Sequence, residues 1–463
     1  MVRPKVEPEL EKIHPQAAGI DIGASEHWVS IPAELDPEPI RKFSCFTADL
    51  YAIAEWLKSR GITTVAMEST GVDWIPLFQI LETSGLEVRL VNARFVKTVP
   101  GRKRDVLDCQ WLQRLHSYGL LSGSFRPDDQ VCVFRSYIRQ RDRLTKSASG
   151  KCDLGVSPSR APFQDSVHIQ RMQKALTEMN VQLHRVVSDI TGVTGMAIIR
   201  AILSGERDPQ RLAALKDPRA KRSIDEIAAA LVGDYRVEHL FVLKQELSLY
   251  DTYQQQIQQC DHQIEQCLSA FDSQSDEPLP PRPKGKKPSR NAPDFDLRSH
   301  LYRISGVDFT QIDGLEALTV QSIISEVGLD PTRFPTSKHF TSWLGICPGS
   351  KISGGKILSS KTRTVVNRAS NAFRIAAQSL ANSQTALGGF YRRIRTRSGA
   401  PIAITATAHK LARIFYHLWT TGEDFVDAGA EAYEQQYQQR VLKHLKQRAK
   451  KMGFDLVPEL IVA

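Results

Sequence analysis

Four carboxylates have the spacing of a site for a hard metal ion. Asp21 lies in the apolar run GIDIG, where an uncompensated charge is costly to bury, and Glu68 ends the apolar run TVAME. Asp105 and Asp108 are three residues apart in RDVLDCQWL, so on a helix they share a face. Mg²⁺ prefers carboxylate oxygens, and two such ions can hold the attacking and leaving oxygens of a phosphoryl transfer. Taken singly, only Asp21 favours this chemistry over a structural role, since Asp105, for example, could simply cap its helix.

A serine with nucleophilic potential lies far along the chain. Ser353 precedes Gly354 and Gly355 and is flanked by Lys351 and Lys356. The glycines allow the backbone to approach a phosphate closely, and the lysines could stabilise the charge of a pentacoordinate transition state. A serine attacks only when it is positioned and deprotonated, however, and a serine before two glycines is more often just a turn.

The positive charge is concentrated in one segment. Between Asp330 and Glu423 there is no Asp or Glu, and these 92 residues hold 14 Lys or Arg. The rest of the chain holds 47 basic and 51 acidic side chains, so the segment accounts for the whole net charge of +10. A long surface without carboxylates favours a phosphate-rich partner, and nucleic acid fits this pattern better than chance clustering in a basic protein.

Length and composition exclude several classes of protein. With 463 residues the chain should form about three domains. No uncharged apolar run approaches the roughly 18–20 residues of a membrane span. The seven cysteines contain no C-x-x-C pair, which argues against a disulfide scaffold or a zinc ribbon and favours a reducing, cytoplasmic compartment.

The four carboxylates lie on predicted strands and on one predicted helix. Residues 18–22, 28–31 and 41–46 read as strands, followed by alternating helices (50–60, 72–84, 105–118) and strands (64–67, 86–91), which is an α/β pattern around a mixed sheet. Apolar residues repeat every seven positions from Leu243 to Phe271, which predicts a long helix for a coiled coil or an antiparallel partner.

Further along, residues 272–299 hold six prolines and read as a linker. Residues 307–328 place the turn Gly314-Leu315 between two helical stretches. This is the pattern of a phosphate-binding helix–hairpin–helix unit and of many other helical hairpins. A final amphipathic helix is predicted at about 431–451.

Several long motifs resemble transposases of the insertion-sequence-110 family, in its 1111 subgroup. The matching stretches include AAGIDIGASEHWV, TVAMESTGVDWIPLFQILE, GRKRDVLDCQWLQRLHSYGLL, CPGSKISGGK and NRASNAFRIAA, and they are spread over most of residues 15–422.

The resemblance implies a RuvC-like, RNase H-like α/β domain with a DEDD metal site over residues 15–125 and a coiled-coil middle over 126–271. The linker 272–299, a mainly helical serine transposase domain over 300–421 with the helix–hairpin–helix-like unit, and a C-terminal helix and tail over 422–463 would follow.

The resemblance also implies a function. Asp21, Glu68, Asp105 and Asp108 would bind two Mg²⁺ or Mn²⁺ ions, and Ser353 would form a 5′-phosphoserine link with DNA. Different protomers of a dimer or tetramer would supply the two halves of the site, and a non-coding RNA encoded by the element would guide recognition of donor and target DNA. The residues expected to contact nucleic acid are Arg102, Lys103, Arg104, Lys351, Lys356, Lys361, Arg363, Arg368 and Arg374. The implied protein is a cytoplasmic, nucleoid-associated bacterial transposase.

One segment departs from the family pattern. Residues 147–166 interrupt a predicted helix with two prolines and several helix-breaking residues. This leaves open an inactive nucleic-acid-binding remnant. The other alternative is a RuvC-like, structure-specific nuclease that hydrolyses DNA with a metal-bound water.

Overall fold

The computed structural model describes residues 11–69, 71–91, 105–148, 167–282, 291–363, 365 and 367–457. The chain divides into two compact units, Met1–Arg126 and Pro127–Ala463. Among the described residues, no helix combines the length and the apolar composition that a membrane span requires.

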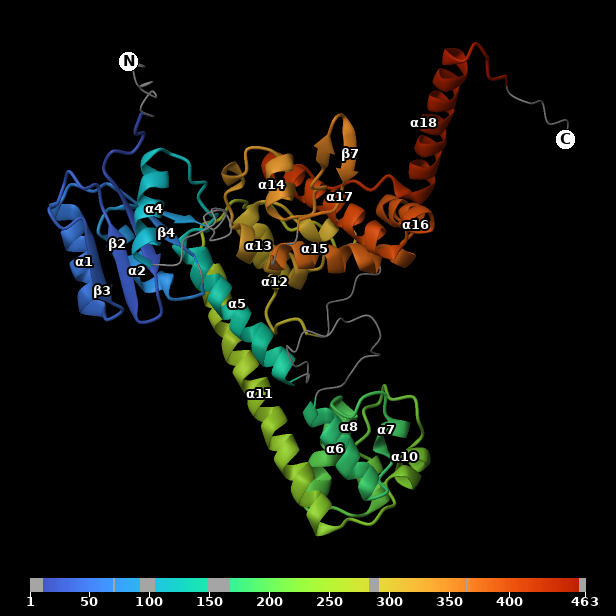
Figure 1. Ribbon diagram of the computed structural model, residues 1–463. Helices are drawn as coiled ribbons and strands as arrows, with labels where there is room; N and C mark the ends of the chain where they lie inside the picture. Colours follow the sequence, from blue (N-terminus) through green and yellow to red (C-terminus); the bar gives the residue numbers. More distant parts are fainter. Residues whose placement is uncertain are drawn as a thin grey trace, which may run out of the picture. The chain divides into compact units, whose positions relative to one another are not determined.

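A five-stranded mixed sheet organises unit 1 (Figure 1). Its strands are β1 (Ala17–Ile22), β2 (Glu26–Ser30), β3 (Ile40–Ser44), β4 (Thr64–Glu68) and β5 (Glu87–Val91), in the spatial order β3-β2-β1-β4-β5. β1, β2 and β3 pair antiparallel, whereas β4 lies parallel to β1 and β5 parallel to β4. The predicted mixed sheet is confirmed, and its topology is consistent with an RNase H-like fold.

Helices cover both faces of this sheet. α1 (Thr47–Ser59) and α2 (Trp74–Thr83) pack on one face, in a core that includes Ile20, Met67 and Leu77. α4 (Asp105–Ser117) packs on the opposite face, where Leu112 contacts Ala66 and Val91 in a smaller core. Side chains alternate between the two faces along each strand, so neighbouring residues of β1 belong to different cores.

Antiparallel helices form the first part of unit 2. α5 (Asp129–Ala148) and α6 (Val167–Glu178) both pack on the 33-residue helix α11 (Val237–Ser269), as Figure 1 shows. Gln130, near the start of α5, donates to the Ala270 carbonyl oxygen at the end of α11, whereas Arg141, later in α5, contacts Asp261. His168, near the start of α6, contacts Glu246, whereas Glu178, at its end, contacts His239 nearer the start of α11, so both helices run antiparallel to α11. The predicted long helix and antiparallel partner are confirmed, while a coiled coil stays a prediction.

A small helical bundle surrounds α6 and the start of α11. It contains α7 (Leu183–Val186), α8 (Val193–Leu203), α9 (Pro209–Ala213) and α10 (Ile224–Ala230). Their apolar side chains, among them Leu176, Ile198 and Leu231, form one buried core with Leu243 of α11.

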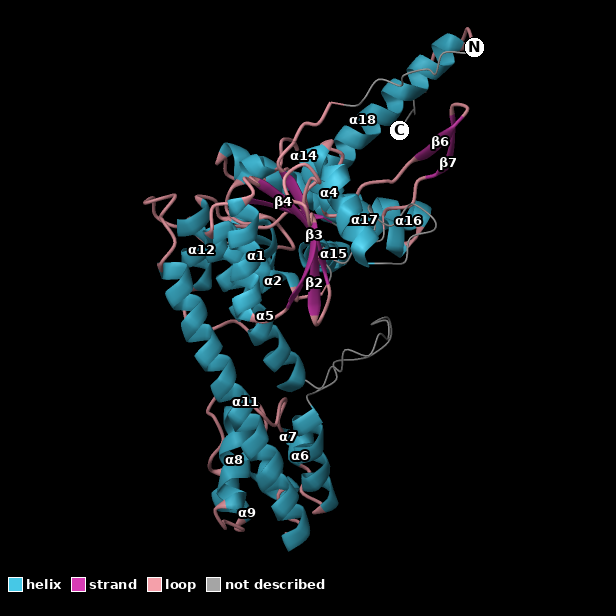
Figure 2. Cartoon of the chain, turned by 60° about the vertical axis from the view of Figure 1, so that its left-hand side comes forward, coloured by secondary structure: helices cyan, strands magenta, loops and turns pink. Residues whose placement is uncertain are grey.

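The remainder of unit 2 is mostly helical. Its helices are α12 (Leu297–Ser305), η1 (Phe309–Gln311), α13 (Ala317–Val327), η2 (Pro331–Arg333), α14 (Ser337–Trp343), α15 (Arg368–Ser379), η3 (Leu380–Asn382), α16 (Ala386–Ser398), α17 (Ala400–Thr421) and α18 (Gly429–Lys451). Phe309, Phe340, Phe373 and Phe415 pack together as the aromatic centre of this region. Figure 2 shows a separate two-stranded hairpin, β6 (Lys351–Ser353) and β7 (Lys356–Ser359).

Candidate active site and nucleic-acid interface

Asp21 and Glu68 lie at the ends of two neighbouring strands and point to the same face. β1 and β4 are parallel and pair Ile20 with Met67, so the next pair in this register is Asp21 beside Glu68. Ile20 and Met67 belong to the core under α1 and α2, and the alternation of side chains therefore turns Asp21 and Glu68 toward α4. Asp21 is partly exposed, whereas Glu68 is buried, with 7% of its surface exposed.

Gly19 sets the distance between this face and α4. A Cβ at Gly19 would lie 2.2 Å from the backbone nitrogen of Gln113 and 2.4 Å from the carbonyl oxygen of Cys109. Only glycine allows a helix backbone to approach a strand so closely. Sequence reasoning missed this role, although a glycine two positions before Asp21, and so on the same face, was the available signal.

The electrostatics around Cys109 connect β1 to α4. Burial, together with the negative charges of Asp21 and Asp108, raises the pKa of the Cys109 thiol to about 12. The thiol is therefore protonated at neutral pH. Because the Asp21 and Asp108 carboxylates both affect this one buried thiol, both charges lie near the contact between β1 and α4.

The candidate metal site draws on three of these described carboxylates and on Asp105. α4 begins at Asp105, whose side chain lies outside the described residues. Among the side chains that the structure does describe, no three His, Cys, Asp or Glu gather closely enough to hold an ion. The available donors are all carboxylate oxygens, which suit Mg²⁺ or Mn²⁺. A metal site stays a prediction.

Ser353 lies at the tip of the β6–β7 hairpin. It pairs with Lys356 across Gly354 and Gly355, whose φ angles are +54° and +75°. Two central residues with positive φ make the type I′ turn that matches the twist of a hairpin, so the two glycines serve the turn directly. Every residue of β6 is exposed, and among the residues that the structure describes the Ser353 hydroxyl has no hydrogen-bond partner.

Apolar side chains flank this serine in an exposed position. Ile352, Ile357 and Leu358 are 64%, 67% and 69% exposed. An isolated two-stranded hairpin is marginally stable in water, and exposed apolar residues on it indicate a surface that another molecule covers.

The predicted nucleic-acid contacts of this region fall into two groups. Lys351, Lys356 and Lys361 are exposed on or beside the hairpin. The arginines make contacts within the protein: Arg363 donates to the Ser342 carbonyl and hydroxyl oxygens, Arg368 pairs with Asp142 at 3.4 Å, and Arg374 donates to the Thr405 hydroxyl. Arg363 and Arg368 keep exposed surface for a further contact.

Two of the predicted segments lie outside the described residues. One holds Arg102, Lys103 and Arg104, and the other is residues 149–166 of the atypical segment. Both stay predictions.

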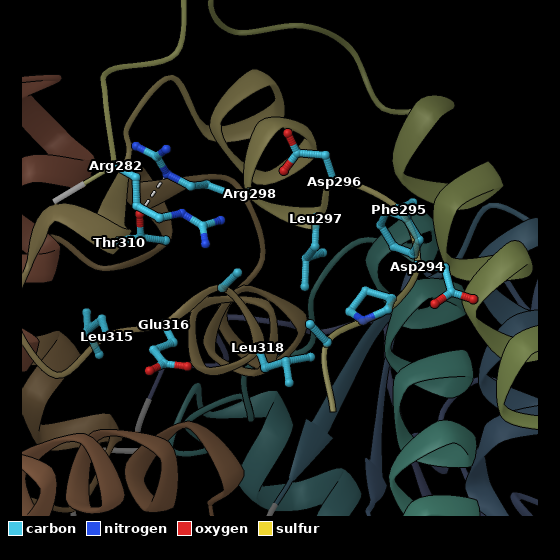
Figure 3. A pocket seen from close by; sticks show the side chains of 13 residues that line it. Arg282, Asp294, Phe295, Asp296, Leu297, Arg298, Thr310, Leu315, Glu316 and Leu318 are labelled. Atoms are coloured by element: carbon cyan, nitrogen blue, oxygen red, sulfur yellow. Dashed lines mark hydrogen bonds between the residues drawn. The ribbon is translucent and has the colours of Figure 1, made fainter. Parts of the chain in front are cut away.

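The predicted helix–hairpin–helix unit has a different first half from the one expected. A single 3₁₀ turn, η1, precedes Gly314, because the Asp308 carboxylate accepts hydrogen bonds from Thr310 and pairs with the buried Arg298. The adjoining cavity has a volume of about 400 Å³. Arg298 donates a hydrogen bond to Thr310 in its lining, and Arg282 lies close by (Figure 3). Asp294, Asp296 and Glu316 line the same cavity, so charges of both signs meet there and it has no surplus for a phosphate. The helix–hairpin–helix function stays a prediction.

Together these features define a class of protein. A unit consistent with an RNase H-like fold carries carboxylates beneath a helix, and a second, mostly helical unit carries a long basic segment, as in an enzyme that acts on nucleic acid. Comparison with protein families makes this specific. Residues 18–151 match the DEDD domain of the IS110 family, described as "Transposase", and residues 308–392 match "Transposase IS116/IS110/IS902 family". Two segments of the chain thus match transposase domains of this family, which supports a DNA-processing transposase of an insertion sequence. No curated protein matches the chain.

Proposed function

We propose that the protein is a Mg²⁺-dependent, RNA-guided recombinase that moves its own insertion sequence through a phosphoserine intermediate. The observation that supports this most directly is the convergence of Asp21 and Glu68 on the face that α4 covers, with Asp108 on α4 acting on the same buried thiol as Asp21. The DEDD transposase match covers all four predicted carboxylates.

The metal half of the site would be built by unit 1. Asp21, Glu68, Asp105 and Asp108 would hold Mg²⁺ or Mn²⁺, most simply two ions. When bound, the ions supply positive charge that stabilises the phosphoryl group during displacement. The protein's own contribution is to fix the carboxylates on a rigid sheet and helix. The absence of a side chain at Gly19 allows these two elements to pack closely.

The nucleophile would be supplied by unit 2. The bond between Ser353 Oγ and phosphorus forms as the bond between phosphorus and O3′ breaks. The serine proton is lost, and the departing O3′ takes up a proton to leave as a hydroxyl. The energy of the broken phosphodiester is kept in the serine ester, so the strand can be rejoined to another DNA end without ATP. Lys351 and Lys356 flank the reacting serine and would neutralise the phosphate.

Recognition would be divided between RNA and DNA. The carboxylate-free segment 331–422 supplies charge for backbone contacts, which carry no sequence information. Sequence choice would then rest on base pairing with a guide RNA encoded by the element. The protein would act as a dimer or tetramer in which one protomer supplies the carboxylates and its partner supplies Ser353.

The test is a search for the protein–DNA adduct. Wild-type protein, Mg²⁺, its guide RNA and end-labelled donor DNA should give a covalent adduct on a denaturing gel, mapped by mass spectrometry to Ser353. Ser353→Ala and Asp21→Asn should each abolish it, whereas replacement of a nearby exposed serine, Ser350→Ala, should leave it unchanged.

A hydrolytic nuclease is the alternative that the hairpin favours. The Ser353 hydroxyl has no described hydrogen-bond partner and therefore no base at its own position. If Ser353→Ala still cuts DNA but does not join it, while Asp21→Asn does not cut, a metal-bound water is the nucleophile and the serine mechanism is wrong. A wild-type protein that binds its RNA and DNA but never cuts would identify an inactive remnant.

A further inference from the structure

One face of α17 forms the floor of two adjoining cavities in unit 2. The larger, of about 1080 Å³, lies between α17, the base of the β6–β7 hairpin, α16 and α18. The smaller, of about 440 Å³, continues along α17 toward α14. Lys410 and Arg413 line both cavities, so the two form one groove. The floor residues follow helical spacing: Ile402, Thr405, Ala406, His409, Lys410, Arg413, Tyr416, His417 and Thr420.

Positive charge lines this groove. Lys361, Lys410, Arg413 and Arg440 contribute cations, and the lining residues of both cavities include no Asp or Glu. None of the four forms a salt bridge with a carboxylate of a described residue. Cations that line a groove without ion-pair partners favour an anionic ligand.

Lys410 shows the charge surplus most clearly. It is half-buried, and burial lowers its pKa, with Arg440 lowering it further and Asp427 opposing the shift. Asp427 is outside the cavity lining and accepts a hydrogen bond from the backbone nitrogen of Ala386. A polyanion in the groove would therefore relieve repulsion among cations that Asp427 compensates only in part.

Apolar and aromatic surface alternates with these cations. The Lys410 ammonium lies 4.7 Å from the centre of the Phe390 ring and 5.1 Å from that of Tyr433, and both rings line the larger cavity. Ile402, on the floor, is 56% exposed. A duplex presents its phosphates outward, and its bases are stacked inside, so they cannot contact this apolar surface. Unpaired bases can stack and pack on it.

The dimensions suit a short strand. Ile402 and Thr420 are 18 residues apart on α17, which corresponds to about 27 Å of helix. At roughly 6 Å per nucleotide for an extended strand this gives about four or five nucleotides, at the lower end of the sites that single-strand-binding proteins use. α18 forms one wall and is anchored by the ion pair of Arg393 with Glu434 and by the close approach of Tyr433 to Gly389.

We infer that this groove binds a single-stranded segment of nucleic acid. Its phosphates contact Lys410, Arg413 and Arg440, and its bases lie against Phe390, Tyr433 and Ile402. The inference depends on the proposed function only for the choice of nucleic acid as the polyanion, and it requires neither the metal site nor attack by Ser353.

The test compares charge removal inside and outside the groove in the full-length protein. Fluorescence anisotropy measures binding of single-stranded DNA, single-stranded RNA and duplex DNA over a range of salt concentrations. Lys410→Gln with Arg413→Gln removes two groove cations. Lys446→Gln with Lys450→Gln removes two exposed cations from the part of α18 beyond the cavity lining.

The salt slope is the slope of the logarithm of the binding constant against the logarithm of the salt concentration. For single strands its magnitude should be smaller in the groove variant by about 1.4, which is about 0.7 for each lost phosphate contact. The affinity lost between about 50 mM and about 200 mM salt then becomes smaller by roughly sevenfold. The α18 variant should keep the wild-type slope. Equal losses in the two variants, or an equal loss for duplex DNA, would overturn the inference. Either RNA or DNA as the tighter single strand supports it and identifies the source.

A second variant covers the case in which loss of Lys410 disturbs folding. Ile402→Glu places a carboxylate on the exposed floor of the groove and should weaken single-strand binding at least as much as the double variant. Ser353→Ala should bind single strands like wild type even though it forms no adduct. Groove variants that bind normally while wild type forms the adduct would defeat this inference alone. Weakened binding without any adduct in wild type would defeat the proposed serine chemistry alone.

Discussion

At the residue scale, the sequence identifies the chemistry-bearing groups better than the groups that hold them. The ends of the strands at Asp21 and Glu68 follow from two short apolar runs, and their shared face follows once the parallel register is known. The role of Gly19 in the close packing of β1 on α4 depends on a helix backbone about ninety residues away in the chain, and a single sequence does not reveal such a contact. For the same reason the partners of Arg363, Arg368 and Arg374 could not be predicted, because Ser342, Asp142 and Thr405 all lie outside their local sequence.

Gly19→Ala tests the contact between β1 and α4. The added Cβ meets backbone atoms of α4, which cannot move aside as a flexible side chain could, so we expect a loss of about 1–3 kcal/mol in the free energy of unfolding. DNA cleavage should fall as well, because any shift of α4 carries Asp108 away from Asp21. Urea unfolding and the adduct assay measure the two effects.

Gly123→Ala is the matched control. A Cβ there meets no atom within 4 Å, and this glycine also belongs to unit 1. Its stability should stay within about 0.5 kcal/mol of wild type. If the two alanine variants are equally stable and equally active, the close packing of α4 on β1 does not matter for the site.

At the element scale, the seven-residue repeat predicted α11 and left a coiled coil and an antiparallel partner helix as alternatives, but it could not explain its own irregularity. Asp261 occupies a position of the repeat where Leu240, Leu247 and Leu268 supply apolar side chains. In the folded protein Asp261 is buried and pairs with the buried Arg141 of α5, which also donates to the Asn291 carbonyl oxygen. The charged position in the seam thus has a partner on α5, 120 residues earlier in the chain. Local sequence patterns predict the helices, whereas contacts between residues far apart in the chain decide which helices pack against each other.

Breaking the Arg141–Asp261 pair should cost far more than breaking an exposed one. Asp261→Leu leaves a buried guanidinium without its carboxylate, and we expect a loss of about 3–5 kcal/mol in the free energy of unfolding. Combining Asp261→Leu with Arg141→Met should recover most of this loss, because the unpaired charge is gone. Chemical denaturation followed by circular dichroism, which reports on α11, gives all three values.

Arg200→Met provides the exposed comparison. Arg200 of α8 pairs with Asp251, which lies on α11 as Asp261 does. Both side chains of this pair are well exposed to water, at 53% and 39%. Its loss should cost about 1 kcal/mol or less. Equal costs for Asp261→Leu and Arg200→Met would mean that burial does not set the strength of the α5–α11 pair.

At the scale of the whole molecule, the charge distribution and the two transposase domains agree. The carboxylate-free segment was visible in the sequence without any structure, because counting charges needs no contacts. The groove on α17 was not visible, since its lining depends on how the successive helices α16, α17 and α18 pack on one another and on the base of the earlier β6–β7 hairpin. The proposed catalytic groups also lie in different units, and this separation makes their supply by different protomers testable.

Mixing two inactive variants tests that arrangement. In a mixed dimer of Asp21→Asn and Ser353→Ala with sites shared between protomers, one of the two sites combines an intact acidic half with an intact serine. Random pairing should therefore restore roughly a quarter of the wild-type sites. Co-purified mixtures, assayed for the adduct, should be active where each variant alone is not.

The same mixture distinguishes the opposite arrangement. If each protomer built its own complete site, every site in the mixture would lack one group, and no activity would return. Mixing wild type with the doubly substituted protein gives the reference for the amount of mixed dimer that forms.

The bare hairpin at Ser353 also matters for the host cell. If this serine is the nucleophile, it lies at the end of a solvent-exposed hairpin where no described residue forms a hydrogen bond that could activate its hydroxyl. A single protomer that binds chromosomal DNA at random would then not cut it, because the complete active site forms only after assembly on the cognate DNA. The mobile element would thereby protect the genome on which its own survival depends.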